Sequence, residues 1–578
     1  MKKLLVANRG EIALRIIRAA RDYGIESVAV YADADATSLH VEYADEAWAL
    51  GGGRASDTYL AIDKIIQIAQ RSGADAVHPG YGFLSERPEF AQAVLDAGLV
   101  WVGPSPEVIR MLGDKIEARR IAAGVGAPLV SGSDGPLSSA QEAVAFAERA
   151  GLPIAIKAAF GGGGRGMKVA RSLEDVGDMF DSAVREATEA FGRGDCYAEQ
   201  FLDKPRHVEA QILADSHGNI LVLGTRDCSL QRRNQKLVEE APAPFLSAEQ
   251  RQRIHDAARK ICSAAGYVGA GTVEFLLSRD GLISFLEVNT RLQVEHPVTE
   301  VTTGIDIVVE QLRIADGLPL RVKETPEPLG HAFEFRINAE DPGRGFLPTP
   351  GRIIRFRAPS GPGVRLDSGV EAGSIVPPLY DSLFAKLVVF APTREEALHR
   401  GRRALREFQV EGIATVLPFH RAVLEEEAFT SATHFGVHTN WIETELDLPP
   451  PAPRVEAQED DLVRTYIEID GKRHQLALPA AFWGKFAAAP ALPDGAREAP
   501  SSQEAGGEIV GVPMPSILQG WLVDDGARVR KGDAIAIIEA MKAEMRITAP
   551  ADGILQHKAK PGSELMAGDT LATILPGG

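Results

Sequence analysis

Residues 283–297 read ISFLEVNTRLQVEHP, and polar residues recur in the second half of this stretch at every second position. Successive side chains of a strand point to opposite faces of its sheet. One predicted face carries Glu287, Asn289, Arg291, Gln293 and Glu295, and the other carries Leu286, Val288, Leu292 and Val294. Five polar groups in a row are costly to bury unless they bind something. The alternation therefore predicts a ligand-binding strand; the alternative is a solvated face with cross-strand charge pairs.

A second strand, TVEFLL at 272–277, precedes this stretch, and SRDGL at 278–282 reads as the hairpin turn between the two. Such a hairpin brings Glu274 alongside Glu287. Two carboxylates and the amide of Asn289 are the hard oxygen ligands that magnesium prefers, and magnesium shares such ligands with nucleotide phosphates. The hairpin therefore predicts a magnesium site.

A glycine-rich loop follows the strand PIAIK, which ends at Lys157. Four successive glycines, 161–164, allow a loop to lie against a phosphate chain with its N–H groups pointing inward. The spacing differs from that of a Walker loop. A flexible tether to the next strand is the alternative, but a tether needs no flanking Lys157 and Arg165. The loop is therefore interpreted as phosphate-binding.

Basic residues gather in TRDCSLQRRNQKLVEEAP at 225–242, where Arg226, Arg232, Arg233 and Lys236 stand in an otherwise acidic chain. Local positive charge concentrates anions. A salt-bridged surface is the other interpretation of the same pattern.

The N-terminal part alternates short apolar strands with helical stretches. The expected strands are LLVAN (4–8), SVAVYAD (27–33), ADAVHP (74–79) and LVWVG (99–103), with helices near 58–71 and 88–97. Strands that alternate with helices indicate βαβ units and a parallel sheet. No G-x-G-x-x-G follows the first strand, so the dinucleotide fingerprint is missing.

The C-terminal part contains a hairpin, a linker and an internal repeat. TYIEIDGKRHQLAL at 465–478 predicts a hairpin that turns at Asp470-Gly471, and 484–507 has the composition of a mobile linker. Glycines at 520, 526 and 532 recur as glycines at 553, 562 and 568, each set being followed by an apolar strand. The repeat predicts a small barrel or sandwich with pseudo-two-fold symmetry. Lys542 would lie at the exposed turn between its halves, as a site of covalent modification or as an ordinary surface lysine.

Composition limits the classes of function. The chain has 578 residues and a net charge of −18, which argues against nucleic-acid binding because phosphate recognition needs clustered Lys and Arg. Its three cysteines form no C-x-x-C pair, as expected for a reducing compartment. No apolar run resembles a secretory signal or a membrane span. We therefore expect a cytoplasmic protein of three to five domains.

The motifs together resemble the α subunit of biotin-dependent acyl-CoA carboxylases of the acetyl- or propionyl-CoA type, in which biotin carboxylase is fused to biotin carboxyl carrier protein. The resemblance rests on LVANRGEIA (5–13), HPGYGFLSE (78–86), GDK (113–115), GGGGRG (161–166), RDCSLQRR (226–233), EVNTRLQVEHPVTE (287–300), FEFRINAEDP (333–342) and EAMK (539–542).

The resemblance implies a fold in parts. It implies a Rossmann-like α/β N-terminal domain (1–113), an ATP-grasp domain (114–330) with a lid at about 130–205, an α+β C-terminal domain (331–445), a hairpin and linker (446–506), and an all-β flattened-barrel biotinyl domain (507–578).

The resemblance also implies the chemistry. Bicarbonate attacks the γ-phosphate of ATP to give carboxyphosphate, which releases CO2 to biotin on the carrier lysine. The implied cofactors and substrates are covalent biotin, ATP, Mg²⁺ or Mn²⁺, and bicarbonate.

Site roles carry over where the motifs match. ATP contacts are implied for Lys115, Lys157, Gly163, Gly164, Glu199, Gln200, Phe201, Leu202, His207, Gln231 and Asn234. Metal ligands are implied at Glu274, Glu287 and Asn289, and a bicarbonate pocket at Lys236, Arg291, Gln293 and Val294. Glu295 matches the base that deprotonates bicarbonate, Arg336 the residue that stabilises the biotin enolate, and Lys542 the biotinylated lysine.

Two positions depart from the family pattern. Asn234 stands where a histidine that touches the nucleotide is usual, so one ATP contact is altered. Ala543 stands where a methionine commonly follows the biotinylated lysine, which shifts recognition by the biotin ligase slightly.

Several partners and alternatives follow from this resemblance. The implied partners are a separate carboxyltransferase β subunit, a biotin protein ligase and a second copy of the biotin carboxylase within a larger oligomer, with no nucleic acid and no membrane. One alternative is a carrier and scaffold with an inactive ATP-grasp half. Another is a lipoyl carrier of a dehydrogenase complex, although Met541 rather than Asp precedes Lys542. The sequence does not indicate which acyl-CoA the complex uses.

Overall fold

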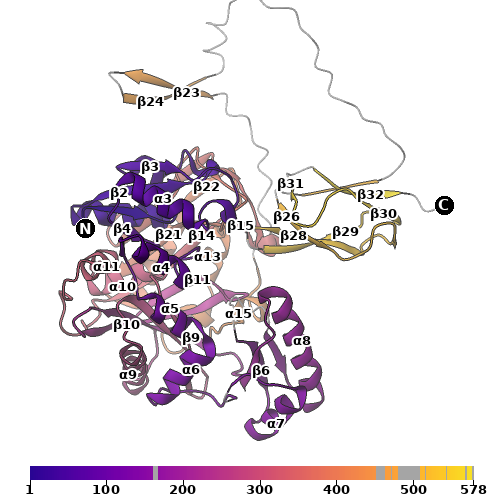
Figure 1. Ribbon diagram of the computed structural model, residues 1–578, viewed down its shortest axis with the longest axis horizontal. Helices are drawn as coiled ribbons and strands as arrows, with labels where there is room; N and C mark the ends of the chain where they lie inside the picture. Colours follow the sequence, from indigo (N-terminus) through magenta and orange to yellow (C-terminus); the bar gives the residue numbers. More distant parts are fainter. Residues whose placement is uncertain are drawn as a thin grey trace, which may run out of the picture. The chain divides into compact units, whose positions relative to one another are not determined.

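The computed structural model describes residues 1–133, 135–159, 167–448, 450, 462–469, 472–479, 508–513, 516–541, 543–565 and 569–575. The chain divides into two compact units, Met1–Val410 with Ala414–Pro451 and Glu411–Ile413 with Ala452–Gly578 (Figure 1). No helix among these residues has both the length and the apolar character that crossing a bilayer requires.

The N-terminal part is the predicted parallel sheet. Its order is β3-β2-β1-β4-β5, and every neighbouring pair is parallel. The strands are β1 (Lys3–Val6), β2 (Glu26–Tyr31), β3 (Glu46–Ala49), β4 (Ala76–His78) and β5 (Val100–Trp101), and the helices are α1 (Gly10–Tyr23), α2 (Leu39–Tyr43), α3 (Ile62–Ser72), α4 (Pro88–Asp96) and α5 (Pro106–Gly113). Helices cover both faces of such a sheet, so the central strand β1 is apolar on both sides and buried at Leu4, Leu5 and Val6.

The main sheet has eight antiparallel strands in the order β13-β12-β9-β10-β11-β14-β21-β19. They are β9 (Arg206–Ala214), β10 (Ile220–Arg232), β11 (Gln235–Ala241), β12 (Gly269–Leu277), β13 (Ile283–Asn289), β14 (His331–Asn338), β19 (Val364–Ser368) and β21 (Leu383–Ala391). The pairing of β11 with β14 crosses the domain boundary expected at 330, so the ATP-grasp and C-terminal regions share one sheet.

Helices pack on this sheet through apolar faces. They are α6 (Lys115–Gly124), α9 (Ala248–Ala264), α10 (His296–Thr303), α11 (Ile307–Ala315), α12 (Arg394–Glu407), α13 (Leu417–Val423), α14 (Glu427–Thr430) and α15 (Trp441–Thr444). Helix α9 begins with a capping box at Ser247 and Gln250. It buries Ile254, Ala258 and Ile261 against the apolar face of β9 and β12. The polar side chains of the same strands point the other way, toward the site described below.

The segment expected as a lid is a small layer with its own core. Its sheet has the order β7-β6-β8, from β6 (Ile154–Ala158), β7 (Met167–Ala170) and β8 (Cys196–Gln200), and its helices are α7 (Ala140–Ala150) and α8 (Leu173–Phe191). Figure 1 shows both helices beside β6. Phe146, Ile156 and Val176 belong to one apolar cluster, all of whose members come from this segment.

The stretch ISFLEVNTRLQVEHP (283–297) is only partly a strand. Strand β13 ends at Asn289, and residues 290–295 form a turn that leads into α10. The expected strand face is therefore wrong beyond Asn289. The physical reason is the start of α10, where Glu295 occupies the N-cap and Pro297 one of the first two helical positions, a position that proline favours.

The smaller unit confirms both the hairpin and the repeat. Strand β23 (Leu462–Ile469) pairs with β24 (Lys472–Pro479), and Ile469 lies opposite Lys472; the turn predicted at Asp470-Gly471 lies outside the described residues. The last part has two four-stranded sheets, β25-β32-β30-β27 and β29-β28-β26-β31.

The two sheets have equivalent strand orders. Their strands are β25 (Glu508–Gly511), β26 (Ser516–Trp521), β27 (Arg528–Val529), β28 (Ala534–Ala540), β29 (Ala543–Thr548), β30 (Gly553–His557), β31 (Glu564–Leu565) and β32 (Thr570–Leu575). Strands four apart in sequence, such as β26 and β30, occupy matching places in the two sheets, as a pseudo-two-fold axis requires.

Short strands, two-residue pairings and 3₁₀ turns complete the fold. They are η1 (Asp33–Asp35), η2 (Ala55–Asp57), η3 (Pro342–Arg344), β15 (Glu340–Asp341), β16 (Leu347–Pro348), β17 (Gly351–Arg352), β18 (Arg355–Arg357), β20 (Ile375–Val376) and β22 (Gln409–Glu411).

Candidate active site

The predicted pairing of two acidic strands is present. Glu274 of β12 lies opposite Glu287 of β13 in the antiparallel register, as the hairpin predicted. The Glu274 carboxylate is buried, and its Oε1 accepts hydrogen bonds from Asn289 Nδ2 at 2.9 Å and Gln293 Nε2 at 3.0 Å. Asn289 and Gln293 therefore converge on Glu274, although the chain between them is not a strand.

Lys236 stands at the centre of the site. Its Nζ atom lies 2.7 Å from Glu209, 2.9 Å from Glu274 and 2.6 Å from Glu295. These carboxylates come from β9, β12 and the N-cap of α10, so β11 presents one cation to three acidic elements. Burial opposes the charge on Lys236, but the three carboxylates outweigh it and raise the pKa of Lys236 well above its ordinary value.

Both carboxylate oxygens of Glu295 are ion-paired. Its Oε1 is ion-paired with Lys236, and its Oε2 lies 2.9 Å from the Arg336 guanidinium. The carboxylate has no exposed surface. Burial alone would raise the pKa of Glu295, but Lys236, Arg336 and Arg226 reverse this and hold the pKa well below the ordinary value. Glu295 is therefore a buried carboxylate that stays ionised at neutral pH.

Arg336 is shared by two carboxylates. Its Nε atom lies 2.6 Å from Glu239 Oε1, while its other end bonds Glu295. Burial, together with the nearby charge of Glu295, outweighs the guanidinium and raises the pKa of Glu239 to about 7. Of the two acids on this arginine, Glu295 keeps the full charge.

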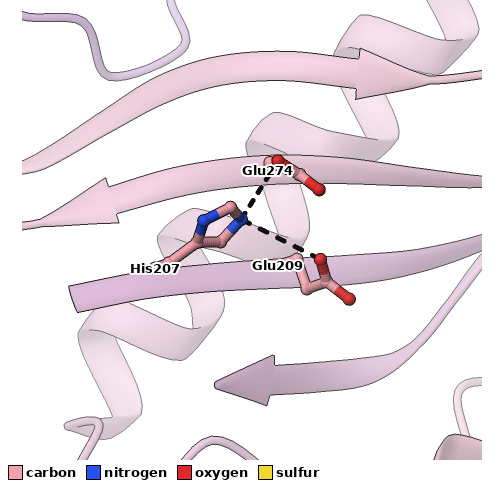
Figure 2. Close-up of side chains that lie close together, drawn as sticks. All are labelled: His207, Glu209 and Glu274. Carbon is pink, nitrogen blue, oxygen red and sulfur yellow. Dashed lines mark ion pairs between the residues drawn. The ribbon is translucent and has the colours of Figure 1, made fainter. Parts of the chain in front are cut away.

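His207 joins the cluster from β9. Its Nε2 atom lies 3.0 Å from Glu274 Oε2 and 4.0 Å from Glu209 Oε2, as Figure 2 shows. Burial lowers the tendency of His207 to protonate, but the charge of Glu274 overrides it, so the pKa of His207 is raised. A protonated His207 is an ion-pair partner of Glu274 rather than a metal ligand.

Arg291 is oriented by four oxygen acceptors, one of which is the Leu292 carbonyl at 3.1 Å. It donates to Asn289 Oδ1 at 2.9 Å and to Gln293 Oε1 at 2.6 Å. Its Nε atom bonds Glu86 at 3.0 Å, and Glu86 also accepts from the Thr290 N–H at 3.1 Å. A loop of the N-terminal part therefore fixes the turn after β13.

The two lysines expected to bind the nucleotide are each ion-paired with a different carboxylate. Lys157 of β6 is ion-paired with Glu199 of β8, whose other oxygen lies 3.0 Å from Arg119. Lys115, the first residue of α6, lies 3.6 Å from Glu287. Burial opposes ionisation of Glu199, but Lys157 and Arg119 lower its pKa below the ordinary value.

The other residues expected at the nucleotide are placed as follows. Gln200 ends β8, Phe201 and Leu202 follow it, and Gln231 is buried on β10. The Phe201 ring lies 5.7 Å below the Arg171 guanidinium, and Phe201 N–H donates to the Pro153 carbonyl at 2.9 Å. Gly163, Gly164 and Lys542 lie outside the described residues.

Asn234 has a local structural explanation. Arg232 pairs with Gln235, so Arg233 and Asn234 form a two-residue turn between β10 and β11. Their φ angles are 48° and 63°, in the left-handed region. Asparagine is among the residues that tolerate this region best. Asn234 therefore suits the turn, whatever it does for a nucleotide.

Sequence reasoning missed Glu209 and misjudged Arg226. Neither residue is exposed: Arg226 Nε lies 2.5 Å from Glu209 Oε1, and its other nitrogens bond Gln211, Thr299 and Thr272. Arg226 is thus a buried support of Glu209, neither part of a salt-bridged surface nor a free cation for anions. The signal for Glu209 was available, because His207, Glu209 and Gln211 alternate with apolar residues along β9.

The donors suit a divalent metal and nucleotide phosphates. Glu274, Glu287 and Asn289 offer hard oxygen atoms on adjacent strands. Among the described residues, two other groups of side chains lie close enough together to hold a metal ion, namely His207 with Glu209 and Glu274, and Glu209 with Cys228 and Glu295. Glu274 belongs both to the first of these groups and to the pair with Glu287, so a metal bound by Glu274 and Glu287 would compete with His207 and Lys236 for the Glu274 carboxylate.

Family models match nearly every region of the chain. Residues 1–109 match the N-terminal domain of biotin carboxylase, 114–323 the ATP-binding domain of the carbamoyl-phosphate synthase L chain, 334–444 the C-terminal domain of biotin carboxylase, and 508–574 the biotin-requiring enzyme domain.

Whole-chain relatives agree with these matches. The biotin-dependent acyl-coenzyme A carboxylase alpha3 subunit of Mycobacterium leprae is 56% identical over 593 aligned residues, covering 99% of this chain and 98% of that protein. A biotin carboxylase–nucleotide complex from Campylobacter jejuni superposes with a TM-score of 0.74 at 42% identity, over 76% of this chain and 98% of that one. The biotin carboxylase domain of a 2-oxoglutarate carboxylase from Hydrogenobacter thermophilus, solved with MgADP, ADP and bicarbonate, gives 0.73 at 44% identity, over 76% and 97%. The protein therefore belongs to the family of biotin-dependent acyl-CoA carboxylase alpha subunits, with a biotin carboxylase fused to a biotin carrier domain.

Proposed function

We propose that Glu295, Lys236, Arg291 and Arg336 carry the biotin carboxylase reaction of this chain, with bicarbonate bound beside Glu295. The observation that supports this most directly is the doubly held Glu295 carboxylate, which has Lys236 on one oxygen and Arg336 on the other. The carboxylate is buried, charged and fixed in direction. A general base must be ionised and must lie within hydrogen-bond reach of the proton that it removes.

Each cation has a distinct part in this proposal. Lys236 and Arg291 neutralise bicarbonate as Glu295 takes its proton and the oxygen attacks the γ-phosphate of ATP. Gln293 and the Val294 backbone complete the pocket. Arg336 stabilises the negative charge that develops when the acceptor nitrogen loses its proton, as a fixed cation does at a developing anion.

The nucleotide is assigned to the region of Glu287, on the hairpin of β12 and β13, where Lys115 lies. Lys115 and Lys157, with Gly163 and Gly164, hold the phosphates; Lys157 would leave Glu199 to do so. Residues 199–202, His207, Gln231 and Asn234 form the rest of the site. Glu274, Glu287 and Asn289 hold Mg²⁺, which when bound supplies positive charge to the phosphates.

Biotin is proposed to be attached at Lys542, between Ala540 of β28 and Ala543 of β29, which pair directly. A biotin protein ligase would attach it, and a separate carboxyltransferase chain would take the carboxyl group to an acyl-CoA. A second copy of the biotin carboxylase is proposed as an oligomer partner. The free, buried Cys196, Cys228 and Cys262 support a reducing, cytoplasmic location.

Bicarbonate-dependent ADP formation with free biotin tests the proposal. The full chain should form ADP only when bicarbonate, ATP and Mg²⁺ are all present. No ADP above the background would favour a carrier with an inactive ATP-grasp half. The intact mass of the C-terminal part distinguishes biotin from lipoate on Lys542.

A further inference from the structure

Lys386 is a buried lysine that the proposed mechanism leaves without a role. It lies in the middle of β21, and its side chain has no exposed surface. Its Nζ atom donates to the Val294 backbone carbonyl at 2.9 Å and lies 3.2 Å from Glu11 Oε1. A buried ammonium group is costly unless it is paired, so the position of Lys386 calls for a function or a strong structural need.

Lys386 has two bonding partners, Glu11 and Val294, which come from separate regions of the sequence. Glu11 lies on α1 of the N-terminal part, and it also accepts a hydrogen bond from the Tyr81 hydroxyl. Asn8 fixes the Tyr81 segment by donating to the carbonyls of Pro79 and Tyr81 at 2.7 and 2.8 Å. The ammonium of Lys386 is thus anchored at one side to a rigid N-terminal element and reaches the turn after β13 with its other side.

The cross-strand neighbour of Lys386 contacts the same turn as Lys386 does. Lys386 lies directly opposite Arg336 in the pairing of β21 with β14. Arg336 bonds the side chain of Glu295, and Lys386 bonds the backbone carbonyl of the preceding residue, Val294. The paired strands β14 and β21 therefore hold two consecutive residues of the turn. Val294 is held by its backbone carbonyl, and Glu295 is held by its side chain.

The turn is held at a third consecutive point. The carbonyl of Gln293 lies 2.7 Å from His296 Nδ1 at the start of α10. Residues 293, 294 and 295 are thus fixed by different elements. Because the side chains of Gln293 and Glu295 also contact Glu274 and Lys236, any rotation of the Val294 peptide would move both.

We propose that Lys386 is a positioning residue, which holds the Val294 carbonyl and thereby keeps Gln293 and Glu295 in register with Lys236 and Arg336 for bicarbonate. The inference rests on the proposed assignment of Glu295 as the base. Lys386 touches no reacting atom; it acts through the peptide of Val294.

The test uses the full chain with the double substitution Glu11→Gln and Lys386→Met. This change removes the ammonium and its nearest carboxylate together, and it removes the donor to Val294, while the neighbouring acids Glu334 and Asp367 stay in place. The KM for bicarbonate should rise about ten- to a hundredfold, the usual range for losing a hydrogen bond from a charged donor. The kcat should fall as Glu295 loses its alignment, while the KM for ATP should change by less than about twofold.

A matched control exists in Arg9→Met with Asp35→Asn. This ion pair, at 2.6 Å, is also buried, and Arg9 also reaches the C-terminal region, where it lies 4.4 Å from the Tyr380 ring centre. It bonds no residue of the turn 290–295. The control should lose thermal stability and keep its KM for bicarbonate. A test variant whose KM for bicarbonate moves no more than that of the control, or whose KM for ATP rises equally, overturns the proposal.

Two further variants cover the remaining outcomes. If the double variant does not fold, Glu11→Gln alone keeps the ammonium but loses its anchor, and a smaller rise in the same KM is expected; an unchanged KM then overturns the proposal. Glu295→Gln separates this inference from its premise. Full activity in Glu295→Gln would mean that the base is misassigned, whereas loss there with no effect at Lys386 would refute the positioning role alone.

Discussion

The ammonium of Lys236 lies 2.6 Å from the buried carboxylate of Glu295, and the same ammonium is shared with Glu209 and Glu274. A single cation thus links the proposed base to the acidic hairpin expected to hold the metal.

Glu295→Gln should abolish the chemical step and spare nucleotide binding. The amide keeps the size of the side chain but cannot accept the proton from bicarbonate, so kcat should fall by about a hundredfold or more. The KM for ATP should stay within about threefold, because Glu295 is ion-paired with Lys236 and Arg336, whereas Lys115 and Lys157 are paired with other carboxylates. Steady-state ADP formation measures both. Glu310→Gln, another buried glutamate, is the control and should retain turnover; a weakened ATP affinity with normal kcat would refute the assignment of the base.

Glu287→Gln should raise the magnesium requirement. Replacing one of two opposed carboxylates removes a charged ligand, so the Mg²⁺ concentration for half-maximal ADP formation should rise about tenfold or more. A magnesium titration at saturating ATP and bicarbonate measures the shift. Because Lys115 lies 3.6 Å from Glu287, the KM for ATP is expected to rise as well. A lower kcat with an unchanged magnesium curve would argue against Glu287 as a ligand.

Lys542→Arg should separate the two halves of the reaction. Arginine keeps the charge but offers no amine for biotin attachment, so carboxyl transfer to an acyl-CoA by the assembled complex should vanish. Carboxylation of free biotin should continue at the wild-type rate. Lys531→Arg, in an exposed turn of the same carrier, should leave both reactions intact. Equal loss of both activities in Lys542→Arg would contradict a carrier that acts only as an acceptor.

Glu300→Gln should destabilise the protein in a pH-dependent way. Glu300 is buried and lies 2.9 Å from Arg15 and 2.7 Å from Arg365. Burial opposes its charge, but the two arginines lower its pKa below the ordinary value. A lowered folded-state pKa stabilises the fold above the unfolded pKa, and this contribution is lost as the pH falls through the folded pKa. At pH 7 the loss should be about 3–5 kcal/mol.

Thermal unfolding from pH 7 down to well below the ordinary glutamate pKa of 4.5 tests this, because the folded-state pKa of Glu300 lies lower still. The difference in Tm between wild type and Glu300→Gln should be largest at neutral pH and should shrink on acidification, as wild-type Glu300 takes up its proton. A difference that grows as the pH falls would give the linkage the wrong sign.

The sequence could predict what short-range patterns determine. The turn at 278–282 is short enough to set the register of its hairpin, and so Glu274 opposite Glu287 could be predicted. The glycine spacing of the carrier repeat similarly predicted its two equivalent sheets. Local periodicity failed after Asn289, because a helix start with Pro297 overrides the extended conformation that alternation assumes.

Contacts between distant segments could not be predicted in the same way. The bond from Lys386 to the Val294 carbonyl joins residues 92 positions apart, and it involves a backbone atom that no side-chain pattern marks. Glu209 did lie in an alternating stretch, but its burial beneath Arg226 depends on β10 crossing beside β9. Long-range strand order, rather than residue type, decides both.

The continuous sheet formed by β11 and β14 also determines how such a protein can be divided. A fragment that ended at residue 330 would keep β11 as an open edge, ready to pair with a strand of another chain, and would lack Arg336. The ATP-binding and C-terminal regions are therefore one structural unit, which cannot be divided at residue 330 without breaking the sheet. The carrier forms both of its sheets from strands within residues 508–575. It can therefore be moved as a unit to other enzymes.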